Sequence, residues 1–298
     1  AVAALAGLPG GRGVARARQA AGAGGDAGRH DEAARRRGRR RRRARGAWRA
    51  WRRRRPSRSK MGVVDNALCT LDPAGGLRWI DVGCGSGAFT SQIAELCSPS
   101  EVVGIDPSDA QIKFAQNRPV AKPVNFQTGD AMALPFEADT FDSATMALVL
   151  FFVPNPMLGV SEMRRVVRED GSVSAYVWDI FGDGLPIKMI HRELRNYGID
   201  YPLPPSAEVS KMENLQKLWG EAGLKSIESK QINVERSFVD FEEFWNVTTP
   251  SPAVSVVFDD LDPDLVMEIR SSVKKELQPD ASGKIICEAH ASAIKGIV

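Results

Sequence analysis

The chain has 298 residues, more than one ordinary domain requires, and its net charge at pH 7 is +3. Residues 1–60 carry 20 of the 40 Lys and Arg residues and only three acids, whereas residues 61–298 carry 34 acids. The four cysteines form no C-x-x-C pair and have no His at metal-ligand spacing, so we expect no metal site and a reducing, cytoplasmic location. The longest apolar run, 144–153, is too short to span a bilayer, so we expect no membrane partner.

Residues 1–60 are almost entirely Ala, Gly and Arg. They lack the apolar area that offsets chain entropy, so we expect a disordered tail followed by one domain over 61–298. Four interpretations stay open: a nucleic-acid-binding arm, an organelle presequence, a solvated linker, or translated sequence upstream of the true start. The last is favoured, because the chain begins with Ala and Met61 lies where the composition changes.

The first predicted unit of the domain is a strand at 77–82, a glycine-rich turn and a helix at 87–97. Gly83, Gly85 and Gly87 stand at alternate positions, where the absent Cβ atoms allow a tight turn and close approach to a ligand. The helix N–H groups beyond the turn would face that ligand. A second strand at 102–106 ends in Asp106, nineteen residues after Gly87, where a carboxylate can accept both hydroxyls of a ribose.

A glycine turn alone does not identify the ligand, because this one also satisfies the dinucleotide fingerprint G-x-G-x-x-G/A. Two acids distinguish it: Asp81 lies inside the end of the first strand, and Asp130 closes a third unit, NFQTGD at 125–130. Together with LPFEADTFDSATMALV and EMRRVVREDGSVSAYVWD, these features resemble the class I S-adenosylmethionine-dependent methyltransferases, close to the methyltransferase type 11 group. The resemblance covers roughly residues 77–298.

Alternating strands and helices continue along the domain, which indicates a doubly wound α/β fold with a mostly parallel sheet. We expect strands near 124–127, 143–148 and 172–178, helices near 109–117 and 156–168, and a turn at 169–171. Proline-rich residues 180–210 predict a lid insertion with one helix; later helices are expected at 211–222, 241–246 and 264–277, and strands at 226–234 and 284–297. The resemblance implies a seven-stranded, Rossmann-like sheet of order 3-2-1-4-5-7-6 with strand 7 antiparallel.

The resemblance also implies S-adenosylmethionine as the donor substrate and assigns residues to it. The turn holds its methionine end, Asp106 its ribose and Asp130 its adenine amino group, while the carbonyl of Ala147 faces its ammonium group. The complete set is Asp81, Gly83, Cys84, Gly85, Gly87, Asp106, Pro107, Asp130, Ala131 and Ala147. Each acid could instead be a helix cap or turn residue, and Cys84 fits its position as a small residue better than as a nucleophile.

Fewer sequence features indicate where the methyl acceptor binds. Many relatives of this family carry His after the fourth strand, where this chain has Phe151 and Phe152, so an apolar pocket is expected. Asp179, at the end of the fifth strand, is the predicted catalytic proton acceptor, although a capping role explains it equally well. His191 and His290 are expected to be structural.

The sequence therefore predicts methyl transfer from S-adenosylmethionine to a small-molecule acceptor. Two alternatives stay open: an RNA or protein methyltransferase that uses the basic tail to reach its substrate, and a non-catalytic protein that binds S-adenosylmethionine. The sequence does not indicate an oligomeric state.

Overall fold

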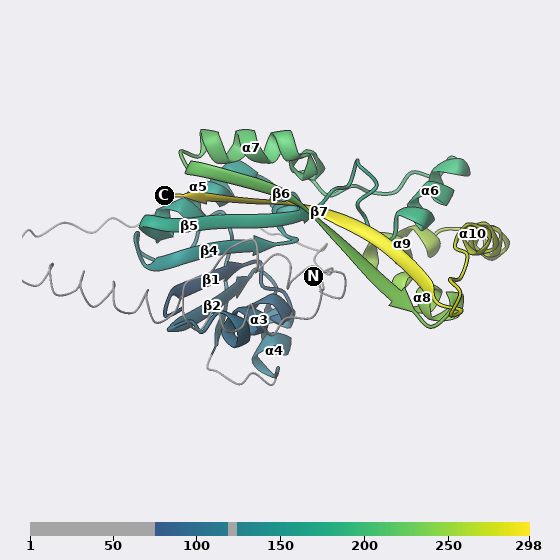
Figure 1. Cartoon of the computed structure of the whole chain (residues 1–298), viewed down its shortest axis with the longest axis horizontal. Helices are drawn as coiled ribbons and strands as arrows, with labels where there is room; N and C mark the ends of the chain where they lie inside the picture. Colours follow the sequence, from purple (N-terminus) through teal and green to yellow (C-terminus); the bar gives the residue numbers. More distant parts are fainter. Residues whose placement is uncertain (1–74, 119–123) are drawn as a thin grey trace, which may run out of the picture.

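The computed structural model describes residues 75–118 and 124–298, which form a seven-stranded sheet of order β3-β2-β1-β4-β5-β7-β6 (Figure 1). β7 is antiparallel to both of its neighbours, and β1 to β5 are parallel, so the predicted fold class and strand order are confirmed. The predicted tail over 1–60 and the residues up to 74 lie outside the described part of the chain. The strands are β1 (Arg78–Val82), β2 (Glu101–Asp106), β3 (Asn125–Thr128), β4 (Phe141–Ala147), β5 (Val167–Trp178), β6 (Lys225–Phe238) and β7 (Ile285–Ile297).

Helices cover both faces of the sheet, as the apolar strands require. In β1, Ile80 and Val82 pack on the face covered by α5 (Pro156–Val166) and α7 (Met212–Glu221). Trp79 alternates to the other face, which is covered by α3 (Ala88–Leu96) and α4 (Asp109–Gln116). α5 begins where the sequence indicates, because the side chain of Asn155 accepts a hydrogen bond from Leu158 N at 3.1 Å.

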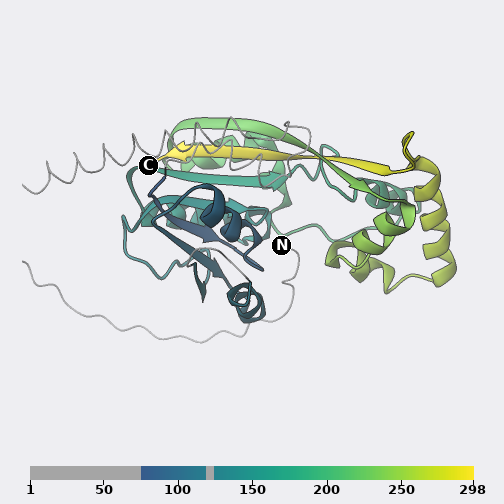
Figure 2. The same cartoon turned by 60° about the horizontal axis from the view of Figure 1, so that its bottom comes forward.

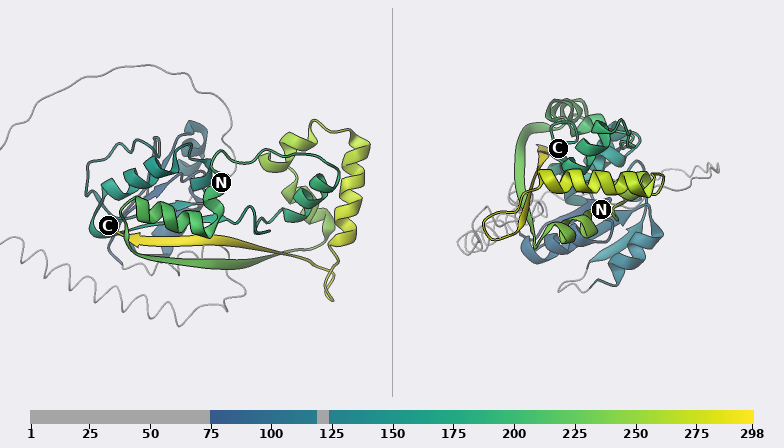
Figure 3. Two further views of the ribbon diagram at one scale, coloured as in Figure 1. Left: turned by 90° about the horizontal axis from the view of Figure 1, so that it is seen from above. Right: turned by 90° about the vertical axis from the view of Figure 1, so that its right-hand side faces the viewer.

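A second lobe stands beyond one end of the sheet and is joined to it by the extended β6–β7 ribbon (Figures 2 and 3). It contains α6 (Lys188–Asn196), α8 (Phe241–Thr248), α9 (Pro252–Phe258) and α10 (Pro263–Glu276). Its core is separate from that of the sheet and centres on Phe244, which is fully buried and packs edge-on against Phe238 at 5.4 Å. The sequence predicted α8 and α10 approximately but missed α9.

The predicted lid at 180–210 takes part in both lobes. Its helix α6 packs into the core of the second lobe, whereas its short helix η3 (Ala207–Ser210) contacts η2 (Leu150–Phe152) after β4. Ser206, just before η3, links η3 to η2. Its N–H donates to Phe151 O at 3.0 Å and its hydroxyl donates to Val153 O at 2.8 Å. Closure of this segment over a ligand stays a prediction.

The predicted turn at 169–171 is wrong, because β5 already begins at Val167. Phe141 pairs with Val167 but Ser143 pairs with Ser172, so the intervening residues of β5 form a bulge rather than a helix–strand turn. Asp170 adopts a positive φ of 60° within the bulge, and a Cβ on Gly171 would lie 2.8 Å from Asp142 O. The local sequence at 169–171 indicates an irregular backbone. That β5 nevertheless extends back to Val167 depends on the pairing of Val167 with Phe141 of β4.

Candidate functional site

The glycine turn after β1 is held against the end of β2. The N–H groups of Gly83 and Cys84 both donate to Ile105 O, at 2.7 and 2.9 Å. Gly83, Gly85 and Gly87 all have positive φ values, of 75°, 52° and 75°. A Cβ on Gly83 would lie 2.4 Å from Val149 Cγ1, so this position requires glycine for space as well as for conformation.

The carboxylate of Asp106 lies beside this turn and is 8% exposed. Its Oδ2 accepts the Gly85 N–H at 2.8 Å, and its Oδ1 accepts the Ser108 N–H at 2.9 Å. These two bonds fix the direction of the carboxylate, while each oxygen keeps a lone pair for a further donor. Asp106 can therefore accept ligand hydroxyls without moving. Pro107 follows it and is exposed.

Asp81 is fully buried behind the turn, on the sheet face covered by α3. Its Oδ2 accepts the hydroxyl of Thr90 at 2.7 Å, but its Oδ1 makes no hydrogen bond with any described residue. Burial raises the pKa of this carboxyl to about 7, the Thr90 bond opposes the rise, and the nearby Asp106 charge adds to it. The β1–β4 register places Thr145 beside Asp81, and its hydroxyl is also buried without a described partner.

Cys84 has no features of a nucleophile. Its side chain is buried, and this burial raises the pKa of the thiol, with the Asp81 charge adding to the effect. Its Sγ packs closely against Gly104, where an added Cβ would lie 3.0 Å from it.

The remaining predicted donor residues lie at the same carboxyl edge of the sheet. Asp130 follows β3 and is exposed; its Oδ1 accepts the Met132 N–H at 2.8 Å, which leaves Oδ2 for a ligand. Ala131 is next to it and partly buried. Ala147 ends β4, and Leu148 after it has a positive φ of 60°, a conformation unusual for a branched side chain.

At the end of β5, Asp179 makes two kinds of contact. Its Oδ1 accepts the Gly182 N–H at 2.8 Å, as expected for the capping role that was the alternative interpretation of this residue. Its Oδ2 lies 3.2 Å from Nε2 of His290 on β7, a contact that the sequence did not indicate. Both side chains are about a quarter exposed or less. The catalytic role predicted for Asp179 stays a prediction.

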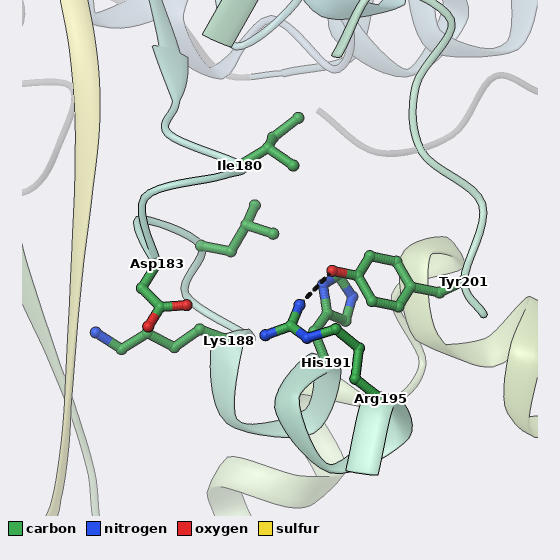
Figure 4. A pocket seen from close by; sticks show the side chains of 7 residues that line it. Ile180, Asp183, Lys188, His191, Arg195 and Tyr201 are labelled. Carbon is green, nitrogen blue, oxygen red and sulfur yellow. Dashed lines mark hydrogen bonds between the residues drawn. The ribbon is translucent and has the colours of Figure 1, made fainter. Parts of the chain in front are cut away.

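A small open recess lies between the loop after β5 and α6 (Figure 4). His191 is buried at its base and stacks on Tyr201 with ring centroids 3.8 Å apart. Arg195 donates to the Tyr201 hydroxyl at 2.8 Å. Ile180 and Asp183, from the loop that begins at Asp179, line the opposite wall.

The two residues of the predicted apolar acceptor pocket differ in their exposure. Phe151 is buried and packs edge-on against Phe152 at 4.6 Å, so core packing explains it. Phe152 is 40% exposed and remains available to a ligand. Trp178 is partly buried between the two cores of the sheet.

The sheet order, the glycine turn and the acids at successive strand ends correspond to one known family. Residues 80–175 match a family model described as methyltransferase domain. This part of the chain is a methyltransferase type 11 domain.

Two curated relatives and one solved structure are similar to this chain. The 2-methyl-6-phytyl-1,4-hydroquinone methyltransferase 2, chloroplastic, of Oryza sativa subsp. japonica is 31% identical over 156 residues, 52% of this chain and 41% of that protein. Demethylmenaquinone methyltransferase of Staphylococcus aureus (strain JH9) is 35% identical over 100 residues, 33% of this chain and 42% of that protein. The chain thus spans less than half the length of these relatives. The YcgJ protein from Bacillus subtilis, at 19% identity and TM-score 0.54 over 78% of this chain and 97% of that chain, shares the fold.

The residues of the methyltransferase domain fit S-adenosylmethionine as the donor. An ammonium group bound at the turn would supply Asp81 Oδ1 with an electrostatic partner, directly or through a water, and Asp106 is oriented for ribose hydroxyls. The donor supplies an electrophilic methyl group on sulfur. In the described ranges, His, Cys, Asp and Glu form no group of three or more that could hold a metal ion. No helix in those ranges is long and apolar enough to cross a membrane.

The structure brings all predicted donor residues to one sheet edge, where their binding roles stay predictions. Sequence reasoning missed two participants. Thr90 could have been found from its position in the first turn of α3, nine residues after Asp81. His290 could not, because it is 111 residues from Asp179 and meets it only through the antiparallel β5–β7 pairing.

Proposed function

We propose that the chain transfers a methyl group from S-adenosylmethionine to a small aromatic acceptor of the hydroquinone class. The observation that carries the proposal is the cluster at the carboxyl edge, where the glycine turn, Asp81 and Asp106 meet. One buried carboxylate there has an oxygen without a described partner, and the other is aimed by two backbone N–H groups. This arrangement suits a ligand that carries both an ammonium group and a ribose.

The hydroquinone class is supported by the names of the two curated relatives and by the chemistry of the acceptor side. An exposed Phe152 and a partly buried Trp178 offer apolar surface to a ring. Asp179 and His290 offer a carboxylate and an imidazole that can handle a hydroxyl proton. The cytoplasmic location stays a prediction from the cysteines.

The first experiment measures donor binding. Isothermal titration calorimetry of the full chain should detect S-adenosylhomocysteine, and substituting Asp106 should weaken that binding. Tighter binding of NAD than of S-adenosylhomocysteine would overturn the donor assignment, because the same glycine spacing also suits a dinucleotide.

The second experiment measures transfer. Reduced 1,4-naphthoquinone (1,4-dihydroxynaphthalene) is incubated with S-adenosylmethionine under anaerobic conditions, and release of S-adenosylhomocysteine and the methylated product are followed by mass spectrometry. The matched control is 1,4-dimethoxynaphthalene, which has the same ring but no hydroxyl proton. Transfer to the first and not to the second supports the proposal. Donor binding without transfer to any hydroquinone, phenol or amine would favour the non-catalytic alternative, and transfer to RNA or protein only would favour the macromolecular one.

A further inference from the structure

Asp179 and His290 form a side-chain pair at the end of β5. The register pairs Trp178 with Ala291, so Asp179 follows directly opposite His290. Backbone hydrogen bonds hold the two residues side by side. Asp179 N donates to His290 O at 3.2 Å, and His290 N donates to Gly184 O at 3.0 Å. Gly184 N closes the loop by donating to Asp179 O at 2.8 Å. The imidazole and the carboxylate therefore meet on a rigid frame.

The two carboxylate oxygens of Asp179 have different tasks. Oδ1 is used by the Gly182 N–H, which fixes the plane of the carboxylate, and Oδ2 is directed at Nε2 of His290. A carboxylate opposite Nε2 favours the tautomer that carries its proton there, so Nδ1 becomes the basic nitrogen. The side chain of His290 keeps 21% of its surface exposed. An exchangeable proton can thus reach it.

The pair lies at the same edge as the donor residues. β5 is the neighbour of β4, and β7 is the neighbour of β5. The register aligns Ala147 with Tyr176 and Tyr176 with Ala293, so His290 lies two strands across from the end of β4 and three residues further along. At about 4.8 Å per strand and about 3.3 Å per residue, the separation is roughly 14 Å. Figure 1 shows the end of β5 at the waist between the sheet and the second lobe.

We propose that His290 is the general base that takes the hydroxyl proton of the acceptor and that Asp179 is its positioning residue; this rests on the proposed function. The acceptor O–H bond breaks and its proton passes to Nδ1 of His290. The resulting anion is nucleophilic at oxygen and, by resonance, at ring carbons. A bond then forms between the acceptor and the methyl carbon while the sulfur–methyl bond breaks, and its electron pair stays on sulfur. One proton is released to solvent per turnover, from His290 or from the methylated ring carbon.

The test compares His290→Gln with Glu288→Gln, a substitution at an exposed residue two positions away on the same strand. Gln can still donate a hydrogen bond to Asp179 but cannot accept a proton at neutral pH. We expect kcat of His290→Gln to fall on the order of 10²-fold or more, with KM and donor affinity within about twofold of wild type. The control should keep full turnover.

Two further measurements distinguish a general base at His290 from a residue that only stabilises the structure. The defect of His290→Gln should shrink when the acceptor hydroxyl is made more acidic with halogen substituents, because such an acceptor ionises without help. Free imidazole should restore part of the turnover of His290→Ala. Independently of turnover, diethyl pyrocarbonate should modify His290 in the wild type, as detected by peptide mass spectrometry, and 1,4-dihydroxynaphthalene should protect it.

The role of Asp179 is tested with Asp179→Asn against Asp200→Asn, a substitution at an exposed residue of the same 180–210 segment. The Asn amide at 179 still accepts the Gly182 N–H but presents an N–H to Nε2, which favours the wrong tautomer. We expect a fall in kcat on the order of 10²-fold for Asp179→Asn only, with the same dependence on acceptor acidity. Full activity of His290→Gln, or a loss that is independent of acceptor acidity and not rescued by imidazole, would overturn the proposal. An inactive wild type would instead refute the proposed function.

Discussion

The Asp81→Asn substitution tests how the fold treats a carboxyl group behind the glycine turn. Asp81 is fully buried, and one of its oxygens has no described hydrogen-bond donor. Its charged form is therefore poorly solvated in the folded chain. Asn has nearly the same shape as protonated Asp but cannot ionise, so it isolates the contribution of the charge.

The magnitude follows from the pKa of Asp81. Burial raises it from 3.8 to about 7. A raised pKa means that the folded state binds the proton more tightly, so the associated stability is fully present below about pH 4 and is lost as the pH rises to about 7. Between about pH 5 and about pH 8 the loss spans roughly two pKa units. At 1.36 kcal/mol per unit, the free energy of unfolding should fall by about 2 to 3 kcal/mol from this group alone.

The assay is thermal and urea unfolding of wild type and Asp81→Asn at both pH values, without ligand. Subtracting the two proteins removes the pH dependence that all other groups contribute. Relative to wild type, the variant should gain about 2 to 3 kcal/mol between about pH 5 and about pH 8, or roughly 5–10 °C in Tm for a domain of this size. A difference that does not change with pH would refute the argument, because Asp81 would then ionise in the folded chain as freely as in the unfolded one.

Three further predictions concern the donor site and the second lobe. Asp106→Ala should weaken S-adenosylhomocysteine binding by about 1.5 to 3 kcal/mol in calorimetry, since a charge-assisted hydrogen bond is lost. Glu101→Gln at the other end of β2 should leave the binding unchanged, and equal effects of the two substitutions would contradict the role of Asp106 in donor binding. Gly83→Ala should lower the free energy of unfolding in urea by about 1 to 3 kcal/mol, and adding Val149→Ala should restore part of the loss by removing the 2.4 Å contact; no restoration would mean that φ alone matters. Phe244→Ala should cost about 3 to 5 kcal/mol of stability in the second lobe, measured by hydrogen exchange, with donor affinity retained; a matching loss of affinity would show that the lobe supports the donor site.

Much of the donor site can be predicted from sequence because it depends on local patterns. The glycines reveal the turn through their spacing. Asp106 is recognised because it ends a short apolar strand, and Asp130 because it closes the next strand-turn unit. Parallel strands place their carboxyl ends at one edge, so residues far apart in sequence are expected together without knowledge of the exact pairing. The resemblance supplied the strand order, which the structure confirms.

The acceptor side was decided by tertiary structure, since it depends on register between distant segments. Only the antiparallel pairing of β7 with β5 brings His290 to Asp179. The burial that shifts the pKa of Asp81 requires α3 and β4 to close around it, and no local pattern reports that enclosure. The second lobe likewise joins α6 to helices inserted between β6 and β7. By itself, the sequence determined where strands end and which end residues are predicted to bind a nucleoside, because periodicity and turn chemistry are local. Long-range packing alone determined which side chains face one another across the acceptor edge.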